Sequence, residues 1–171
     1  YTNSESKFLK KAFAIFQSEE FENNSLLARI IAFTNDATKD INDRIREAKY
    51  GKNAKPYEAG DILMGTSNWK VNYRTKQPLV SNSGDYKVIS SEDSEKQIAG
   101  RIYKGFNITL QNLLDSEDDP IGAFVLSEEL DKEDYEHLAK TYEEIRLEAI
   151  RARGPASAQK WQELSDLKDS F

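Results

Sequence analysis

The sequence predicts an α+β fold in which an α/β unit is followed by a small antiparallel β-barrel and a pair of helices. Three features support this prediction. Apolar residues recur at helical spacing near both ends of the chain, one nearly continuous apolar run lies near the start, and short apolar runs alternate with turn formers in the middle. The expected domains are residues 1–51 for the α/β unit, 52–130 for the barrel and 131–171 for the helices.

The first 51 residues are expected to form a helix, a buried strand and a second helix. Residues 4–22 place apolar side chains on one face at helical spacing. The run Ala-Arg-Ile-Ile-Ala-Phe at 28–33 is typical of a strand buried on both faces of a parallel sheet. Residues 34–36 are good helix-capping residues, and the apolar spacing after them predicts a helix that ends near Tyr50, with Gly51 as its C-cap.

The middle of the chain has the pattern of a small barrel. Glycine, proline and asparagine gather there, and the apolar runs between them are short. Strands are expected at residues 62–64, 78–80, 86–89, 102–113 and 121–126. Several short strands separated by turns favour an antiparallel barrel.

Two helices are expected at the C-terminal end. Asp131 opens a long helical pattern with a dense acidic surface, and Gly154-Pro155 breaks it. Pro155 suits the first turn of a new helix, which contains Trp161, Leu164 and Leu167.

Composition limits the possible functions. The 171 residues include 24 basic and 30 acidic ones and no cysteine, which excludes a disulfide framework, a thiol nucleophile and a thiolate zinc site. No apolar run is long enough for a membrane span, so no membrane partner is expected. The absence of cysteine favours a reducing compartment, and we expect a cytoplasmic protein. The net charge of −6 is uneven, because residues 44–76 contain eight basic and three acidic residues. This stretch suits a polyanionic partner.

The sequence offers no catalytic residue, no metal site and no cofactor-binding residue. The Gly51-Lys52 pair lacks the rest of a phosphate-binding loop, since Arg46 stands where its first glycine would be. The lone His137 lies in an acidic helical pattern and is expected to be solvated or locally paired. A small α/β enzyme is therefore the least favoured functional hypothesis.

Four segments, in order, resemble superfamily 1 DNA helicases of the RecD and Dda type. Residues 31–46 (IAFTNDATKDINDRIR) resemble the start of the second motor domain of these proteins, and residues 57–64 (YEAGDILM) resemble their aromatic-x-x-Gly-Asp pattern before a strand. Residues 80–88 (VSNSGDYKV) resemble the Asn-Gly-Asp/Glu turn of an inserted barrel, with Ser83 interposed. Residues 160–171 resemble the helix that returns the chain to the motor domain.

The resemblance implies an internal fragment of an ATP-dependent DNA helicase or exonuclease-type motor. Residues 1–51 would be part of the second RecA-like domain (2A), residues 52–130 an SH3-like barrel (2B), and residues 131–171 a helical arm with the return helix. ATP and Mg²⁺ would bind the parent protein elsewhere, so this chain alone should be inactive. The implied partners are single-stranded DNA, bound weakly in isolation, and the remaining domains of the parent. Phe33 stands where UvrD-like relatives have an arginine, so no nucleotide contact is expected there.

The candidate nucleic-acid-binding residues form two groups. Thr34 and Asn35 follow the expected strand, where a hydroxyl, an amide and the helix N-terminus can hold a phosphate; the alternative is that they only cap the helix. In the barrel, aromatic and basic groups interleave, a pattern that suits stacked bases and a phosphate backbone; the alternative is a solvated hairpin with its tryptophan packed inside. The barrel candidates are Trp69, Lys70, Asn72, Arg74 and Lys76.

A second function from another class stays open. Residues 115–148 contain thirteen acidic and three basic residues. The barrel and this acidic helical arm could together form a non-catalytic protein-interaction module. Salt-dependent binding of single-stranded oligonucleotides separates the two hypotheses.

Overall fold

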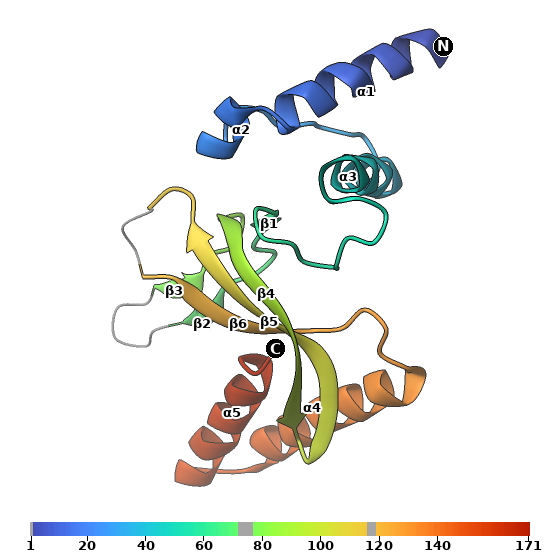
Figure 1. Ribbon diagram of the computed structural model, residues 1–171. Helices are drawn as coiled ribbons and strands as arrows, with labels where there is room; N and C mark the ends of the chain where they lie inside the picture. Colours follow the sequence, from blue (N-terminus) through green and yellow to red (C-terminus); the bar gives the residue numbers. More distant parts are fainter. Residues whose placement is uncertain (1, 72–76, 116–118) are drawn as a thin grey trace. The chain divides into compact units, whose positions relative to one another are not determined.

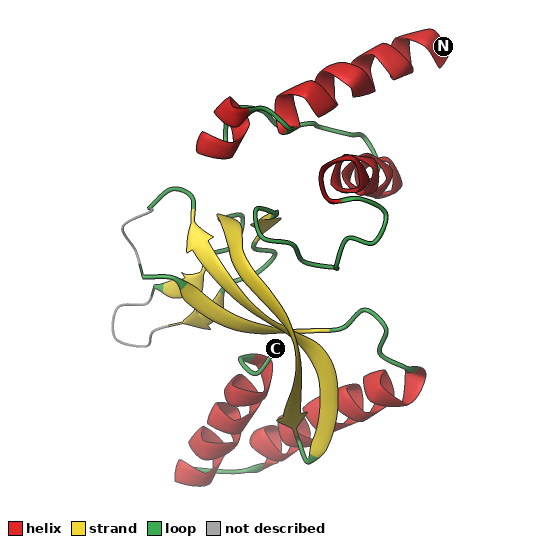
Figure 2. Cartoon of the chain, viewed as in Figure 1, coloured by secondary structure: helices red, strands yellow, loops and turns green. Residues whose placement is uncertain are grey.

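The computed structural model describes residues 2–71, 77–115 and 119–171 and has an α+β fold with antiparallel sheets (Figures 1 and 2). Contacts within the chain divide it into two units, residues 1–62 and residues 63–171. Unit 2 contains the strands beyond residue 62 together with the C-terminal helices, so the acidic helical arm and the β-structure belong to one compact unit.

Unit 1 begins with two helices where the sequence predicts one. Helix α1 spans Thr2–Phe16 and α2 spans Glu19–Asn23. Ser18 interrupts them because its backbone is extended and its hydroxyl accepts a hydrogen bond from the amide of Phe21 at 3.2 Å, which makes it the N-cap of α2. Phe21 is buried and packs edge-on against Phe16, with 4.7 Å between ring centroids. The break therefore places an aromatic pair inside the bend.

The predicted strand at residues 28–33 is wrong. This segment forms neither helix nor strand, and the side chains of Ile31 (91%) and Phe33 (104%) are exposed. A buried strand needs neighbouring strands for its backbone hydrogen bonds. The described residues before Ile62 include no strand that could pair with it, so the expected helix–strand–helix unit is not formed.

Helix α3 (Asn35–Tyr50) agrees with the prediction at both ends. Thr34 is its N-cap, and Gly51 ends it with a φ of 88°, a conformation that costs glycine little.

Within the described ranges, six strands form two sheets. The four-stranded sheet has the order β1-β4-β5-β6, made of β1 (Ile62–Met64), β4 (Asp85–Ile98), β5 (Arg101–Asn112) and β6 (Ile121–Leu126). A two-stranded sheet pairs β2 (Trp69–Val71) with β3 (Pro78–Val80). The predicted strands at 62–64, 78–80 and 121–126 are confirmed, and the one at 102–113 is shifted by one residue. Strand β2 was not predicted.

Strand β4 is far longer than the predicted 86–89. It pairs with β5 as a long antiparallel hairpin, from Tyr86 opposite Asn112 to Ile98 opposite Arg101, with one irregularity between Val88 and Ser90. Ala99 and Gly100 form the turn, both with positive φ (51° and 82°), as tight hairpin turns require. The second half of β4 is polar, so its sequence gave no strand signal.

The buried side of β5 changes along the strand. Before Gly105 its buried side chain is Tyr103, which joins Ile98, Phe124, Leu138 and Leu167 in one core cluster. After Gly105 the buried positions continue with opposite parity, at residues 106, 108 and 110. Gly105 lies at the switch, where an added Cβ would come within 2.6 Å of the Phe124 ring. The hairpin therefore has one core at its helical end and another beside Val88 and Tyr86.

The helical pair agrees with the sequence. Helix α4 spans Lys132–Arg151 and α5 spans Pro155–Lys168 (Figure 1). Asp131 caps α4 by accepting from the Asp134 amide at 2.8 Å, and Pro155 lies in the first turn of α5. The two helices are joined by a hydrogen bond from the Ser157 hydroxyl to the Ala149 carbonyl.

Candidate nucleic-acid interface

Thr34 and Asn35 form the exposed start of α3. The Thr34 hydroxyl oxygen accepts a hydrogen bond from the Ala37 amide at 3.2 Å, so Thr34 caps the N-terminus of α3. Both residues are exposed. A capping hydroxyl keeps its own proton for donation, and the first amides of a helix have no partner within the helix. Capping and phosphate binding are therefore compatible at this position.

Trp69 and Lys70 lie on β2 in unit 2. The Trp69 side chain is half-buried, and its indole nitrogen is buried without a hydrogen-bond partner among the described residues. The Lys70 ammonium lies 4.2 Å from the centre of the Trp69 ring, within cation–π distance. One face of the indole is thus covered by a lysine, and its polar edge is packed, which favours the alternative of a packed tryptophan over a free stacking platform.

Lys70 has an unusual backbone conformation. Its φ is 49°, in the left-handed region that residues with a Cβ rarely adopt. The Asp169 carboxylate, at the C-terminal end of α5, accepts a hydrogen bond from the Lys70 amide at 3.3 Å. Such conformations persist where the surroundings enforce them, and here a contact 99 residues distant in sequence helps to hold the lysine in place.

The remaining predicted residues cannot be placed. Asn72, Arg74 and Lys76 lie outside the described residues. The described candidates are divided between the two units, with Thr34 and Asn35 in unit 1 and Trp69 and Lys70 in unit 2.

Lys96 is a basic residue near Lys70 that sequence analysis missed. It lies on β4, directly opposite Tyr103, and donates a hydrogen bond to the Ser170 carbonyl at 2.7 Å. Burial lowers the pKa of its ammonium, and the positive charge of Lys70 lowers it further. No sequence signal could have found this pair, because the hairpin and the end of α5 bring its members together.

Within unit 1, two of the segments that resemble helicases contact each other. Arg46, at the end of the first segment, forms an ion pair with Asp61 of the second, with 3.0 Å between Nη2 and Oδ2. The Asp61 side chain is only 11% exposed and also accepts from the Glu58 amide at 2.9 Å. Tyr50 donates to the Ala59 carbonyl, and burial together with the Asp61 charge raises the pKa of its phenol. This network holds the loop after α3 against the helix.

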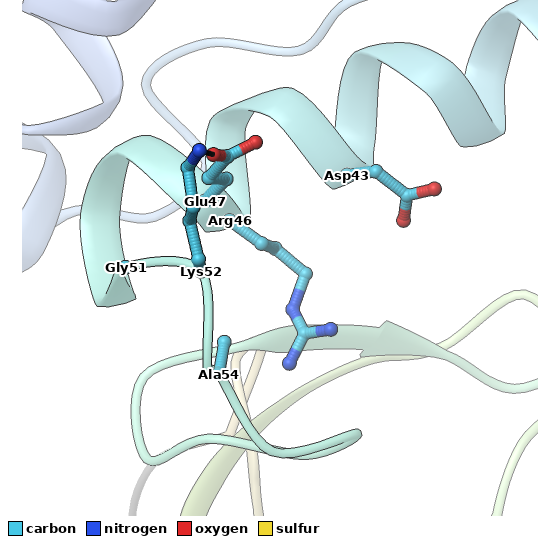
Figure 3. A pocket seen from close by; sticks show the side chains of 6 residues that line it. All are labelled: Asp43, Arg46, Glu47, Gly51, Lys52 and Ala54. Atoms are coloured by element: carbon cyan, nitrogen blue, oxygen red, sulfur yellow. Dashed lines mark ion pairs between the residues drawn. The ribbon is translucent and has the colours of Figure 1, made fainter.

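A shallow hollow of about 350 Å³ lies at the same end of α3 (Figure 3). Asp43, Arg46 and Glu47 line it from the helix, with Gly51, Lys52 and Ala54 from the following loop. Arg46 faces Asp61, and Lys52 lies 3.9 Å from the Glu47 carboxylate. Because each cation already faces a carboxylate, the hollow is a poor site for a phosphate.

His137 is locally paired, as the sequence predicted. Its Nδ1 lies 2.5 Å from the hydroxyl of Tyr103, which is fully buried, and burial raises the pKa of that phenol. Among the residues that the structure describes, no group of three or more histidine, aspartate or glutamate side chains is arranged to hold a metal ion. None of the helices in this part of the chain is long and apolar enough to cross a membrane.

Comparison with known protein families finds no match, and a search of curated proteins finds none either.

Proposed function

We propose that this chain is part of an ATP-dependent superfamily 1 DNA helicase of the RecD and Dda type, to which it contributes contacts with single-stranded DNA and an accessory SH3-like barrel. The observation that supports this most directly is the Arg46–Asp61 ion pair. This ion pair joins two segments, residues 31–46 and residues 57–64, which each resemble the family in sequence. The proposal assigns residues 1–51 to the motor domain on the resemblance alone, because residues 28–33 do not form the strand of a RecA-like unit in this structure.

The chemistry of the described candidates suits a single strand. Lys70 supplies a positive charge beside an aromatic ring, and the exposed N-terminus of α3 supplies amides and a partial positive charge. Contacts of this kind hold phosphates without reading sequence. The chain would therefore bind single strands with little base preference.

In this proposal the hydrolysis of ATP belongs to other parts of the parent protein. Those parts supply the phosphate-binding loop and the Mg²⁺ ligands, and nucleotide-driven closure moves the two motor domains along the strand. The residues of this chain bind and orient the DNA. Purified alone, the chain is expected to hydrolyse no ATP, and an ATPase rate that survives substitution of Thr34 and Asn35 would contradict this assignment.

The experiment that tests DNA binding is a titration of a fluorescein-labelled dT15 oligonucleotide with the full chain at about 20 mM salt, followed by anisotropy. We expect Lys70→Gln to weaken binding severalfold. Lys140→Gln is the matched control, because it removes the same charge from an exposed position on α4. Absence of binding by the wild-type chain, or equal loss in both variants, would refute the role given to Lys70.

One observation favours the alternative of a protein-interaction module. On α4, Tyr135 and Ile150 are each 55% exposed, and their spacing of fifteen residues places them about 60° apart around the helix. Leu147 (36%) is a third exposed large hydrophobic side chain on this acidic helix, and such side chains suit a protein partner. Under this alternative, the chain binds no oligonucleotide at any salt concentration.

A further inference from the structure

The outer edge of β4 is open along the second half of the strand. Strand β1 lies on that side of β4, but it has only three residues against the fourteen of β4. Gly65, directly after β1, donates to the Gly84 carbonyl at 2.9 Å, which places β1 beside the first part of β4. Residues 90–98 pair with β5 on one side, and no described strand pairs with them on the other. Such an edge presents unpaired backbone groups to a partner.

The register decides which backbone groups of β4 face outward. Ile98 and Arg101 flank the two-residue turn and lie directly opposite each other, so they share backbone hydrogen bonds. Bonded pairs recur at every second residue of an antiparallel pair, so the amides and carbonyls at 91, 93, 95 and 97 point away from β5. Within the described part of the chain, no hydrogen bond occupies the outward backbone groups of Ser91, Glu95 and Gln97.

The open edge is acidic. Glu92 and Glu95 are exposed, and neither has an ion pair among the residues that the structure describes. In contrast, every glutamate of α4 forms an ion pair. Lys96, on the same stretch of β4, donates to the Ser170 carbonyl after α5. The uncompensated charge along the edge is therefore negative.

A protective role for these charges explains part of the pattern. Charged side chains on an edge strand prevent it from pairing with copies of itself. Glu92 and Glu95 do this here, because like charges would face each other if β4 of a second copy were added. Residues 90–98 have neither a proline nor a bulge, which are other common protections. The edge thus repels a second copy but stays open to a strand with basic residues.

We propose that residues 91–97 of β4 bind an extended segment of a partner protein, which joins the sheet as an antiparallel strand with a lysine or arginine opposite Glu92 and Glu95. Main-chain hydrogen bonds to the outward groups supply the affinity, and the opposite-charge pairs fix the register. This inference goes beyond the proposed DNA-binding function and does not depend on it, since it uses neither Thr34 nor Lys70.

The probe is the synthetic peptide TTKVTKT, added at millimolar concentration to the full chain and followed by NMR. When its first residue lies opposite Gln97, its two lysines lie opposite Glu95 and Glu92, and its third and fifth amides face β4. N-methylation of these two amides should weaken binding about tenfold or more, the effect of two lost hydrogen bonds. N-methylation of the fourth and sixth amides, which face away from β4, is the matched control and should change Kd less than about twofold.

Two pairs of protein variants test the same edge. Gln97→Pro removes an amide that points outward, where proline is tolerated, and should weaken probe binding about three- to tenfold. Gln97→Ala keeps that amide and should change Kd less than about twofold. Glu95→Gln should weaken binding about two- to fivefold at low salt, with a smaller effect at high salt. Glu128→Gln, which removes an exposed charge outside the sheet, should leave Kd unchanged.

Amide hydrogen exchange in the wild-type chain needs no variant. Without the probe, the amides of Glu95 and Gln97 should exchange much faster than those at 94 and 96, which are bonded to β5, and the probe should slow them. Slow exchange at Glu95 and Gln97 in the free monomer would show that the chain already covers this edge and would overturn the inference. A dimer without the probe, with these amides slowed, would assign the edge to a second copy instead.

The remaining outcomes separate this inference from the proposed function. If the probe does not bind, or binds equally well whichever amides are methylated, the inference is wrong. A chain that binds dT15 but fails this test keeps the proposed DNA-binding function. A chain that passes it but binds no dT15 loses that function and keeps the open edge as a site for a basic extended segment.

Discussion

The hydroxyl of Tyr103 joins the hairpin to the helical arm, and its removal is a specific test of how unit 2 is held together. Tyr103 is fully buried on β5, and its hydroxyl lies 2.5 Å from Nδ1 of His137 on α4. Tyr103→Phe keeps the ring in the core cluster and deletes only this hydrogen bond. The half-buried His137 then loses its partner.

The expected cost is about 1 kcal/mol, the typical value for a buried hydrogen bond whose remaining partner is partly reached by water. Unfolding entropy is about 2.1 cal/mol/K per residue. For a unit that spans residues 63–171, this corresponds to a fall in Tm of about 4 °C per kcal/mol. Tyr103→Ala removes the ring as well and should cost about 3–5 kcal/mol, as for other large buried side chains.

The assay is urea unfolding followed by circular dichroism, with calorimetry for Tm. Tyr135→Phe is the matched control, since it removes the same hydroxyl from a side chain that is 55% exposed on α4; it should change the free energy of unfolding by less than about 0.5 kcal/mol. A Tyr103→Phe variant as stable as wild type, or a control that loses as much, would refute the role given to the Tyr103–His137 contact.

Three other predictions follow from particular contacts. Gly105→Ala should destabilise the chain by about 1–3 kcal/mol because its Cβ would collide with the backbone carbonyl of Val125 and with the Phe124 ring. Gly122→Ala on the neighbouring strand meets nothing within 4 Å and should be tolerated, and equal unfolding midpoints of the two variants in urea would contradict this. Thr34→Asp keeps an N-cap, so it should leave the stability of α3 near wild type while its negative charge weakens dT15 binding. Thr34→Ala removes the cap and should lower the free energy of unfolding by about 1 kcal/mol. Unchanged dT15 binding in Thr34→Asp would mean that Thr34 only caps α3. Because burial raises the pKa of Tyr103 above its unfolded value of about 10, its contribution to stability is complete below pH 10 and is lost as the pH rises through the folded pKa. The difference in unfolding free energy between wild type and Tyr103→Phe should therefore narrow above pH 10. A difference that stays constant above pH 10 would contradict the raised pKa of Tyr103.

Elements with local signals could be predicted from the sequence. The start of α3 at a capping threonine, its end at Gly51, and the start of α5 at Pro155 each depend on residues within one turn of the boundary. Strand β6 matches its prediction because an apolar run between turn residues is enough to mark it. In each of these elements, the residues that determine the boundary lie within or next to the element itself.

Elements that depend on distant partners could not be predicted in this way. The apolar run at 28–33 has the composition of a buried strand, but no neighbouring strand is described in unit 1, and Phe33 is exposed. The second half of β4 is polar and is a strand only because β5 pairs with it along its length. Lys96 meets the end of α5 across 74 residues of sequence, so this contact follows from tertiary packing alone.

The most direct test of the proposed function is the salt dependence of dT15 binding by the full wild-type chain. If Lys70 neutralises one phosphate, the slope of log K against log salt should be about −0.7 or steeper, since each phosphate of a single strand contributes about −0.7. Binding that is measurable at about 20 mM salt and falls with this slope is the predicted result. No binding at low salt, or binding that is indifferent to salt, would contradict the proposal that this chain holds single-stranded DNA.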